Sequence, residues 1–214
     1  MKVLSVNRSL PRTLLINGKE VSTGIYKEPQ QGHGKVGKLG LEGDGQADLT
    51  VHGGLWQALY AYPIEHYPRW ENEVGRSGLP PGTFGENLTL EGLIETEVCI
   101  GDIHRMGELL LEVTSPRIPC FKLGHKLGKP DILKSFLQSG CSGFYYRVLE
   151  GGSISADTVI EVVSRDAEKL TVRELLGLYR LGEGGVEDLR RALQVAAISP
   201  LVRHELAARL AKLS

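Results

Sequence analysis

The sequence has few cysteines, and the three that it has are widely separated. Cys99, Cys120 and Cys141 are an odd number and show no CxxC spacing. This pattern argues against a disulfide framework, a structural zinc site and an iron–sulfur cluster. We therefore expect a reduced, cytoplasmic protein. Cys99 has apolar neighbours and is expected in the core, whereas Cys141 lies among small residues and is expected in a turn.

The sequence also lacks a dominant charge and any long apolar run. Its 25 basic and 26 acidic residues leave a formal net charge of −1, which gives no electrostatic footprint for nucleic acid or an anionic membrane. No apolar run approaches the length that spans a bilayer. Met1–Ser5 predicts the start of a strand, because no apolar stretch that could serve as a signal peptide follows it. We expect neither nucleic acid nor membrane as a partner.

Nucleotide-binding and redox motifs are missing as well. The sequence contains no GxGxxG fingerprint, no P-loop and no set of iron–sulfur cysteines. If this chain catalyses a two-electron reaction, its electrons must come from another protein.

What is present indicates a mainly β fold over residues 1 to about 163. Short β-rich segments separated by Gly, Pro or Asn turns predict many strands, and many short strands favour a barrel or a sandwich. The predicted strands are Val3–Val6, Thr13–Ile16, Lys19–Ile25, Lys35–Leu41, Asn87–Leu90, Val98–Ile100, Asp102–Arg105, Glu108–Val113, Phe144–Leu149 and Thr158–Val163. Helices are expected at Ile64–Val74, where Pro68 either kinks the helix or delays its start, and at Asp131–Gln138.

After Ser164 the hydrophobic period becomes helical. Thr171–Glu174 is a capping-box sequence, and Pro200 is suited to the first turn of a helix. Apolar residues at helical spacing predict three short helices that pack into a small bundle. We therefore expect two domains, residues 1–165 and residues 166–214. Basic and acidic residues are nearly balanced in the second, which argues against DNA binding despite its helical pattern.

Cys120 lies on a loop stiffened by two prolines. Pro116 and Pro119 each fix their own φ and favour an extended conformation of the preceding residue. Arg117 and Lys122 on either side favour the thiolate, the form that attacks substrates or binds soft metals. The alternative is a small buried hydrophobic residue in a tight turn.

Three further motifs stand in register with this loop. The four segments, in order, are Leu41–Asp44, Val51–Gly54, Thr83–Leu88 and Pro116–Cys120. In this order and spacing they resemble the MOSC family, named for the C-terminal domain of molybdenum-cofactor sulfurase. The resemblance runs from about Lys35 to Val163, and the helical C-terminus extends it to the YiiM-type bacterial proteins. It implies a MOSC β-barrel with flanking helices, followed by the three-helix bundle.

The resemblance also implies the molybdenum cofactor (Mo-molybdopterin) as the bound group. In MOSC reductases the pterin dithiolene supplies two sulfurs, and the cysteine aligned with Cys120 binds the metal. The cofactor phosphate needs cations and backbone donors. Arg117 offers a bidentate contact, Lys122 a second charge, and Gly53 and Gly54 leave amide N–H groups accessible. Alternatively, Arg117 pairs with a carboxylate and Lys122 is a solvated surface charge.

His52 and the segment around Glu86 carry the remaining roles that the resemblance implies. His52 either relays a proton near the metal or orients a loop by hydrogen bonding. Glu86 and Asn87 match the edge of a pterin, or else stabilise a turn through side-chain-to-backbone bonds. Asp44 is most simply an Asx-type turn. The other histidines, expected to be surface or structural residues, are His33, His66, His104, His125 and His204.

These implications lead to one functional hypothesis and two rivals. The family reading is an oxidoreductase that reduces N-hydroxylated compounds, such as hydroxylaminopurines or amidoximes, to amines with electrons from a flavoprotein donor. The first rival is a non-catalytic carrier of the molybdenum cofactor or of sulfur, using Cys120. The second is an interaction module whose C-terminal helices form the working surface. No particular lysine supports pyridoxal phosphate as a cofactor.

Overall fold

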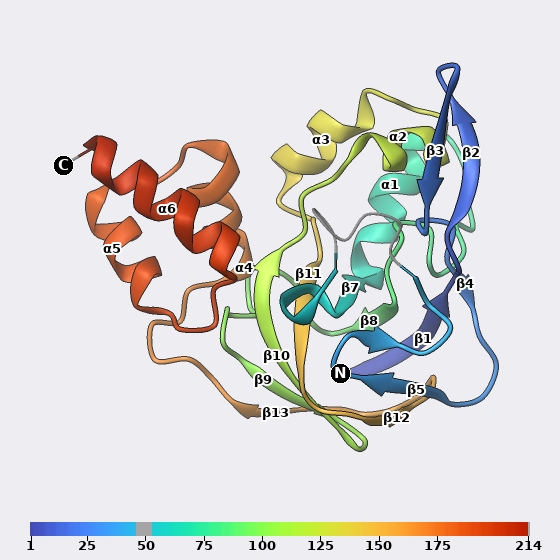
Figure 1. The fold of residues 1–214 in the computed structure, drawn as a ribbon, viewed down its shortest axis with the longest axis horizontal. Coiled ribbons are helices and arrows are strands. Elements are labelled where there is room, and N and C mark those ends of the chain that lie inside the picture. The colour runs from blue at the N-terminus through green and yellow to red at the C-terminus, as the bar shows by residue number, and fades with distance from the viewer. Residues whose placement is uncertain (46–52, 214) are drawn as a thin grey trace.

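The computed structural model describes residues 1–45 and 53–213 (Figure 1). The strands of this part are β1 (Lys2–Arg8), β2 (Arg12–Ile16), β3 (Lys19–Thr23), β4 (Glu28–Pro29), β5 (Gly34–Gly37), β6 (Gly40–Leu41), β7 (Leu59–Pro63), β8 (Leu88–Glu91), β9 (Ile103–Met106), β10 (Leu109–Pro116), β11 (Phe144–Glu150), β12 (Gly152–Ile154) and β13 (Ile160–Ser164). The helices are α1 (Tyr67–Val74), α2 (Phe121–Leu127), α3 (Ile132–Ser139), α4 (Val172–Leu176), α5 (Val186–Gln194) and α6 (Pro200–Leu213). Shorter helical turns are η1 (Leu55–Gln57), η2 (Ile64–His66) and the π-helical turn η3 (Gly177–Leu181).

An eight-stranded sheet in the order β13-β9-β10-β11-β7-β8-β1-β4 forms the centre of the molecule. Its neighbouring strands are antiparallel except β7 and β8, which run parallel with Ala61 opposite Leu88. A three-stranded sheet, β12-β5-β6, and the hairpin β2-β3 complete the β structure. Helices α1, α2 and α3 lie at one end of the strands beside the hairpin. The C-terminal helices lie together beyond β9 and β10, on the side away from the hairpin (Figure 1).

The predicted β-barrel is wrong, because the large sheet is not closed within the described residues. Its edge strands are β13 and β4, at opposite ends of the strand order. An isolated bridge between Lys2 and Val159 joins β1 to the segment before β13, but one bridge does not make a ladder. Strand β4 is two residues long and contains Pro29, which has no N–H to donate to a further strand. The mainly β composition and the flanking helices agree with the prediction.

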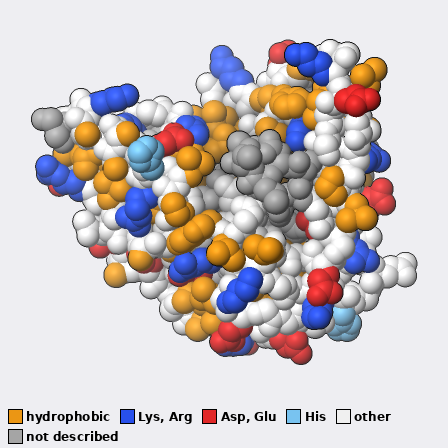
Figure 2. Space-filling model, viewed as in Figure 1, with side chains coloured by type: hydrophobic (Ala, Val, Ile, Leu, Met, Phe, Trp, Pro, Cys, Tyr) orange, Lys and Arg blue, Asp and Glu red, His pale blue; other side chains and the backbone are white. Residues whose placement is uncertain are grey.

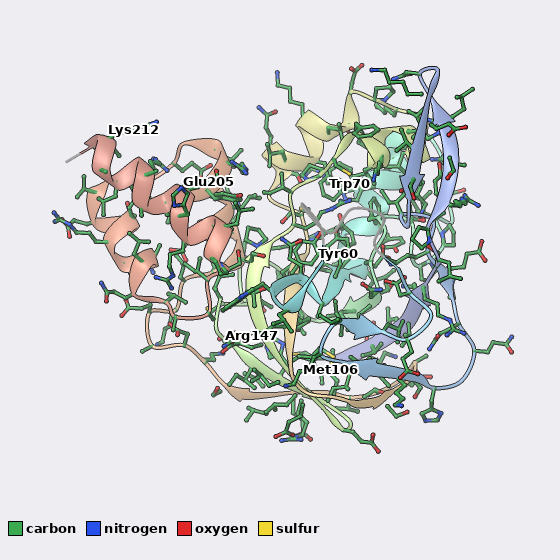
Figure 3. All side chains as sticks on the ribbon, in the orientation of Figure 1. Tyr60, Trp70, Met106, Arg147, Glu205 and Lys212 are labelled. Atoms are coloured by element: carbon green, nitrogen blue, oxygen red, sulfur yellow. The ribbon has the colours of Figure 1, made fainter. Side chains whose placement is uncertain are left out.

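Two hydrophobic clusters fill the interior. The larger joins buried residues of the central sheet, such as Leu111, to residues of the C-terminal helices, such as Leu175 and Leu206, so the apolar core is continuous across residue 165. The second is aromatic and lies beneath α1 and α3, with Trp70 stacked on Phe136 at 4.9 Å between ring centroids. Figure 3 shows Trp70 and Tyr60 on the helical side of the sheet, far from Met106.

The helices begin and end largely where the sequence predicts. The segment expected to be helical over residues 64–74 is the turn η2 followed by α1, and Pro68 lies in the first turn of α1. Helix α3 ends at Gly140, whose φ of 76° needs glycine. The capping box of Thr171 and Glu174 opens α4. Helix α2, directly after Cys120, was not predicted.

The surface in Figure 2 carries acidic and basic side chains interspersed, without a patch of one sign. In the part of the chain that the structure describes, no helix is both long enough and apolar enough to cross a membrane.

Candidate functional site

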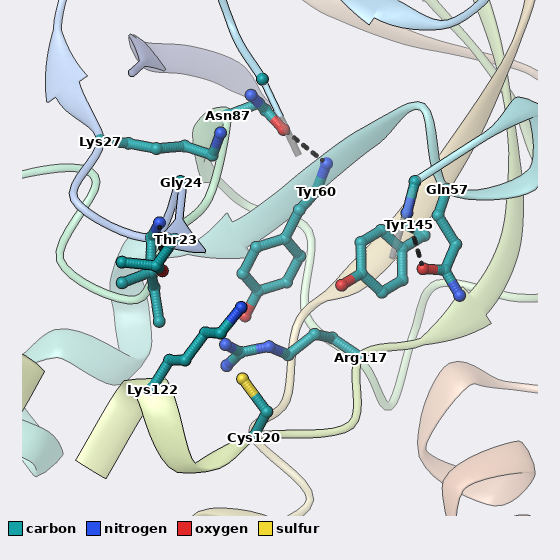
Figure 4. A pocket seen from close by; sticks show the side chains of 14 residues that line it. Thr23, Gly24, Lys27, Gln57, Tyr60, Asn87, Arg117, Cys120, Lys122 and Tyr145 are labelled. Carbon is teal, nitrogen blue, oxygen red and sulfur yellow. Dashed lines mark hydrogen bonds between the residues drawn. The ribbon is translucent and has the colours of Figure 1, made fainter. Parts of the chain in front are cut away.

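One cavity collects most of the residues expected in the site. It lies where the hairpin β2-β3, strand β7 and the loop before α2 meet, and it is lined by Gly53, Asn87, Arg117, Cys120 and Lys122 together with residues not predicted from sequence. Figure 4 shows the Cys120 thiol, the Arg117 guanidinium and the Lys122 ammonium directed into the same part of the cavity. Segments far apart in sequence thus form a single basic, thiol-containing pocket.

Cys120 occupies the N-cap position of α2, four residues beyond the end of β10. Its backbone is extended, at φ −117° and ψ 165°, and its carbonyl accepts a hydrogen bond of 2.9 Å from the Leu123 amide. Its side chain is partly exposed, in contrast to Cys99, which is buried. The rigid end of β10 and the first turn of α2 therefore hold this thiol at the cavity wall.

Arg117 is a buried cation beside this thiol. It is 5% exposed, and its guanidinium carbon lies 5.0 Å from the Tyr60 ring centroid and 5.5 Å from that of Phe136. Its Nη1 atom is buried without a hydrogen-bond partner, and no carboxylate of the described residues forms an ion pair with it. Burial lowers the pKa of Arg117, but its electrostatic interactions with the neighbouring hydroxyl and thiol groups outweigh burial, and the pKa is raised overall. The side chain is fully charged, and no described residue supplies a carboxylate as its counter-ion.

Two lysines add positive charge to the cavity. Lys122 Nζ donates to the Ser22 carbonyl at 3.0 Å, which draws its flexible chain along the wall of the hairpin. Lys27, which the sequence did not single out, is nearly buried and pairs with the carboxylate of Asp44. Burial lowers the pKa of Lys27 despite that partner. An anion entering the cavity therefore meets two cations, Arg117 and Lys122, that no described carboxylate neutralises.

Glu86 lies behind the cavity wall and is fully buried. Its carboxylate accepts hydrogen bonds from the Gly82 amide at 2.7 Å, the Phe84 amide at 3.0 Å and the Thr89 hydroxyl at 3.0 Å. The Tyr67 hydroxyl donates to the same group. These contacts fix the loop before β8, and they match the turn-stabilising alternative for this residue.

Asn87 lines the cavity while its side-chain amide connects β7, β1 and the segment after β6. Its Oδ1 accepts from the Tyr60 amide at 3.1 Å, and its Nδ2 donates to Asp44 Oδ2 at 2.9 Å and to the Asn7 carbonyl at 3.4 Å. Asp44 also accepts from the Ser9 amide at 2.9 Å. The carboxylate is therefore more than an Asx turn, because it connects the Lys27 ammonium to the Asn87 amide.

Gly53 and Gly54 adopt the left-handed φ values of 84° and 73° that favour glycine. Gly53 lines the cavity, and its amide lies 3.4 Å from Gln57 Oε1. The backbone amide of Gln57 donates to the Gly54 carbonyl at 3.2 Å, and this bond closes the turn η1. His52, the predicted proton relay, lies outside the described residues.

Two tyrosines form the aromatic part of the wall and were missed from sequence. The rings of Tyr60 and Tyr145 lie 5.3 Å apart, and the Tyr60 hydroxyl donates to the Ser142 carbonyl at 2.8 Å. Burial raises the pKa of both hydroxyls, so they stay neutral. In the sequence Tyr145 falls within the predicted strand Phe144–Leu149, a pattern that identifies a strand rather than a site.

A metal in this cavity would need ligands beyond those that the described residues supply. Among the described residues, no group of three His, Cys, Asp or Glu side chains is placed to hold a metal ion. A single partly exposed thiol beside unneutralised cations instead suits a metal whose other ligands and negative charge arrive together in an organic cofactor.

Comparison with known proteins agrees with this reading of the site. A profile of the MOSC domain matches residues 48–161, which hold the cavity loop of Cys120 and the segment of Asn87. The chain belongs to the MOSC domain family. It is 42% identical to the protein YiiM of Escherichia coli over 177 residues, which cover 82% of this chain and 79% of that protein. The crystal structure of YiiM from Geobacillus stearothermophilus superposes with a TM-score of 0.83 at 34% identity, and covers 98% of both chains.

A third MOSC relative is much longer than this chain. It is a protein of Gibberella moniliformis named a reductase, 37% identical over 166 residues, which are 76% of this chain but 29% of that protein. These relatives support a molybdenum-cofactor-associated oxidoreductase for the family to which this chain belongs.

Proposed function

We propose that this protein binds the molybdenum cofactor and reduces N-hydroxylated compounds, such as hydroxylaminopurines or amidoximes, to amines. The observation that carries the proposal is the buried Arg117, which no described carboxylate neutralises, next to the partly exposed thiol of Cys120 in one cavity. A desolvated cation without a counter-ion is costly unless an anion binds to it. The MOSC membership and the relative named a reductase support the same chemistry.

The residues of the cavity fit such a cofactor in three ways. The Cys120 thiolate is a soft donor for the metal. The Arg117 fork and the Lys122 ammonium would hold the phosphate, and the missing side chains of Gly53 and Gly54 would let it approach the backbone beside them. Bound in this way, the cofactor supplies the two-electron reduction that no side chain of this protein can supply.

Four further residues position the cofactor and take no part in the reaction. Asn87 and Glu86 hold the loop that faces the pterin, Asn87 at the cavity wall and Glu86 from behind it. The rings of Tyr60 and Tyr145 exclude water around Arg117, which strengthens the attraction between the guanidinium and an anion.

Removing the oxygen of an N–OH group as water consumes two electrons and two protons. We assign the delivery of a proton to His52, because the imidazole titrates near neutral pH and its segment precedes the cavity glycines. The electrons come from a flavoprotein donor.

Exchange of Cys120 for serine tests the metal ligand. Cys120→Ser, purified from cells able to make the cofactor, is expected to contain at least tenfold less molybdenum than the wild type, because a hydroxyl is a poor ligand for a soft metal. Cys99→Ser is the matched control, since Cys99 is a buried core thiol outside the cavity. Equal metal in Cys120→Ser and wild type, with both folded, would contradict the assignment.

A second experiment separates the reductase from the carrier. Cofactor-loaded protein should not reduce a hydroxylamine or an amidoxime with NADPH alone, and should do so once an artificial reductant or a flavoprotein donor is added. His52→Ala should lower turnover more than it lowers cofactor content. A carrier would release cofactor or sulfur to an acceptor protein and show no turnover with any donor.

A further inference from the structure

A second group of reactive side chains lies behind the cavity, where α3 ends and β11 begins. It consists of Cys141 in the turn after α3, His66 at the end of η2, and Glu95 in the loop after β8. The Tyr62 hydroxyl donates to the Cys141 carbonyl at 3.0 Å, which fixes the backbone of this turn. The proposed reductase chemistry uses none of these side chains.

The three side chains are connected in the order thiol, imidazole, carboxylate. His66 Nε2 lies 2.6 Å from Glu95 Oε2, and the imidazole also interacts with the Cys141 side chain, whose Sγ lies 3.8 Å from the Ser139 carbonyl oxygen. The Glu95 side chain is 3% exposed, and its Oε1 accepts from the Gly143 amide at 2.6 Å. A carboxylate fixed by a backbone amide orients the imidazole, and the imidazole contacts the thiol. This arrangement activates a cysteine as a nucleophile.

Two cations lie near the Cys141 thiol, and each is paired with a carboxylate, His66 with Glu95 and Arg173 with Glu183. Burial lowers the pKa of His66, but its hydrogen bonds to Cys141 and Glu95 outweigh this effect and raise the pKa to about 10. Arg173 of α4 is the second cation at this turn. Its side chain packs against Gly140, where an added Cβ would lie 2.5 Å from Arg173 Cδ, and its guanidinium interacts electrostatically with Cys141. Partly exposed thiols near cations are typically reactive, whereas thiols in an apolar core are not.

The surroundings of the thiol favour exchange with a disulfide over acyl transfer. An acyl-transfer site needs backbone amides free to stabilise an oxyanion. Here the Cys141 amide donates to Ser139 Oγ at 3.0 Å, and the Gly143 amide donates to Glu95. Thiol–disulfide exchange needs a thiolate and an accessible sulfur, and no oxyanion donors.

We propose that Cys141 is a nucleophilic thiol, positioned by His66 and Glu95, that reacts with low-molecular-weight disulfides and becomes S-thiolated. Cys141 Sγ attacks one sulfur of the disulfide, and a new S–S bond forms as the old one breaks. The leaving sulfur takes the proton that Cys141 gave up, which His66 delivers. The Cys141 sulfur is oxidised and the released half of the disulfide is reduced to a thiol, so atoms and electrons balance.

The rate of modification in the folded and the unfolded chain tests this proposal. Wild-type protein is treated with hydroxyethyl disulfide at neutral pH, and the mixed disulfide at each cysteine is followed by mass spectrometry of peptides. Cys141 is expected to react at least tenfold faster in the folded protein than in urea, because unfolding separates it from His66. Cys99 should react more slowly when folded, since it is buried. An equal or slower rate for Cys141 in the folded protein would overturn the proposal.

A matched pair of histidine variants then tests the activating group. His66→Gln is expected to slow the modification of Cys141 at least tenfold, while His33→Gln, at an exposed histidine, leaves the rate unchanged. The rate at Cys120 in the same samples serves as an internal reference. An unchanged Cys141 rate in folded His66→Gln would refute the role of the imidazole. If this variant does not fold, the comparison of folded and unfolded wild type still decides the proposal.

Discussion

At the scale of single residues, Arg117 shows how a binding site can oppose the stability of the fold that carries it. The residue is 5% exposed, its guanidinium lies beside aromatic rings, and Nη1 has no hydrogen-bond partner among the described residues. Favourable contact with the faces of Tyr60 and Phe136 offsets part of the cost of desolvation. The rest remains until an anion binds, so the side chain should stabilise the loaded protein and destabilise the free protein.

Arg117→Met should therefore have opposite effects on the two forms. In protein made without cofactor synthesis, we expect the free energy of unfolding in urea to rise by about 1 kcal/mol, because an unpaired buried charge is removed. In loaded protein, cofactor retention should weaken by roughly 2–4 kcal/mol, the order of a charge-assisted, desolvated contact. Lys122→Met, at a more exposed cation, should change the unfolding free energy little. A loss of stability in unloaded Arg117→Met would mean that the arginine is structural.

His104 gives a pH dependence with a definite sign. It is fully buried, its Nδ1 contacts the Tyr146 hydroxyl at 2.6 Å, and burial lowers its pKa to about 4. Between pH 6.5 and 4 the unfolded chain binds a proton here that the folded chain does not, so stability falls as pH falls, by about 3 kcal/mol over the window. His104→Gln should flatten this part of the unfolding curve, and exposed His33→Gln should not. Parallel curves for His104→Gln and wild type would contradict the prediction.

The sequence predicts the site best where its residues are close together in the chain. Arg117 and Cys120 lie in one proline-braced loop and Lys122 in the first turn of the helix that follows, so their shared environment follows from local geometry. Lys27 and Tyr145 reach the same cavity from other segments, and no local pattern marks them. Their positions depend on long-range packing, which short motifs do not encode.

At the scale of elements, the turn between α3 and β11 is constrained by close packing. Gly143 has a φ of +67°, and a Cβ there would lie 2.4 Å from the Ala61 carbonyl oxygen and 2.7 Å from the Tyr60 ring. Gly128, at the end of α2, has a similar φ of +69° but open space where a Cβ would lie. The two glycines share the conformational strain and differ in the steric contact.

Alanine at these two positions separates strain from contact. Gly128→Ala should lower the free energy of unfolding by about 1 kcal/mol, the cost of a left-handed backbone. Gly143→Ala should cost at least 2 kcal/mol more, because the Cβ meets strand β7 as well. Urea unfolding of both variants measures the difference. Equal losses would show that β7 shifts freely to accommodate the extra atom.

Local signals predict the helices better than they predict the sheet. Pro68, Gly140 and the Thr171 capping box mark helix ends through their own backbone chemistry. Helix α2 was missed because prolines precede it and Gly124 lies inside it. The sequence predicts a barrel where the sheet is open, because closure depends on which distant strands pair. Here β4, which contains Pro29, remains an edge strand.

At the scale of the whole molecule, the chain is predicted to divide at residue 165, yet its apolar core does not divide there. The larger hydrophobic cluster contains Leu111 of β10 together with Leu175 of α4 and Leu189 of α5. Backbone hydrogen bonds also join the parts, from the Val172 amide to the Val98 carbonyl at 2.9 Å and from the Arg173 amide to the Glu95 carbonyl at 2.9 Å. Continuity of this kind favours one cooperative unit over two.

A chain ending at residue 165 should therefore fail to fold as a stable unit. Removal of the C-terminal helices exposes apolar residues of β10 and of the segment before β9, which those helices bury in the full chain. We expect the full chain to unfold in urea in one transition with a steep slope, and the shortened chain to aggregate or to unfold with a much shallower slope. If residues 1–165 instead unfold cooperatively with the full chain's midpoint and keep the cofactor, the two-domain division is correct. The helices would then be an appendage available to a partner rather than part of the core.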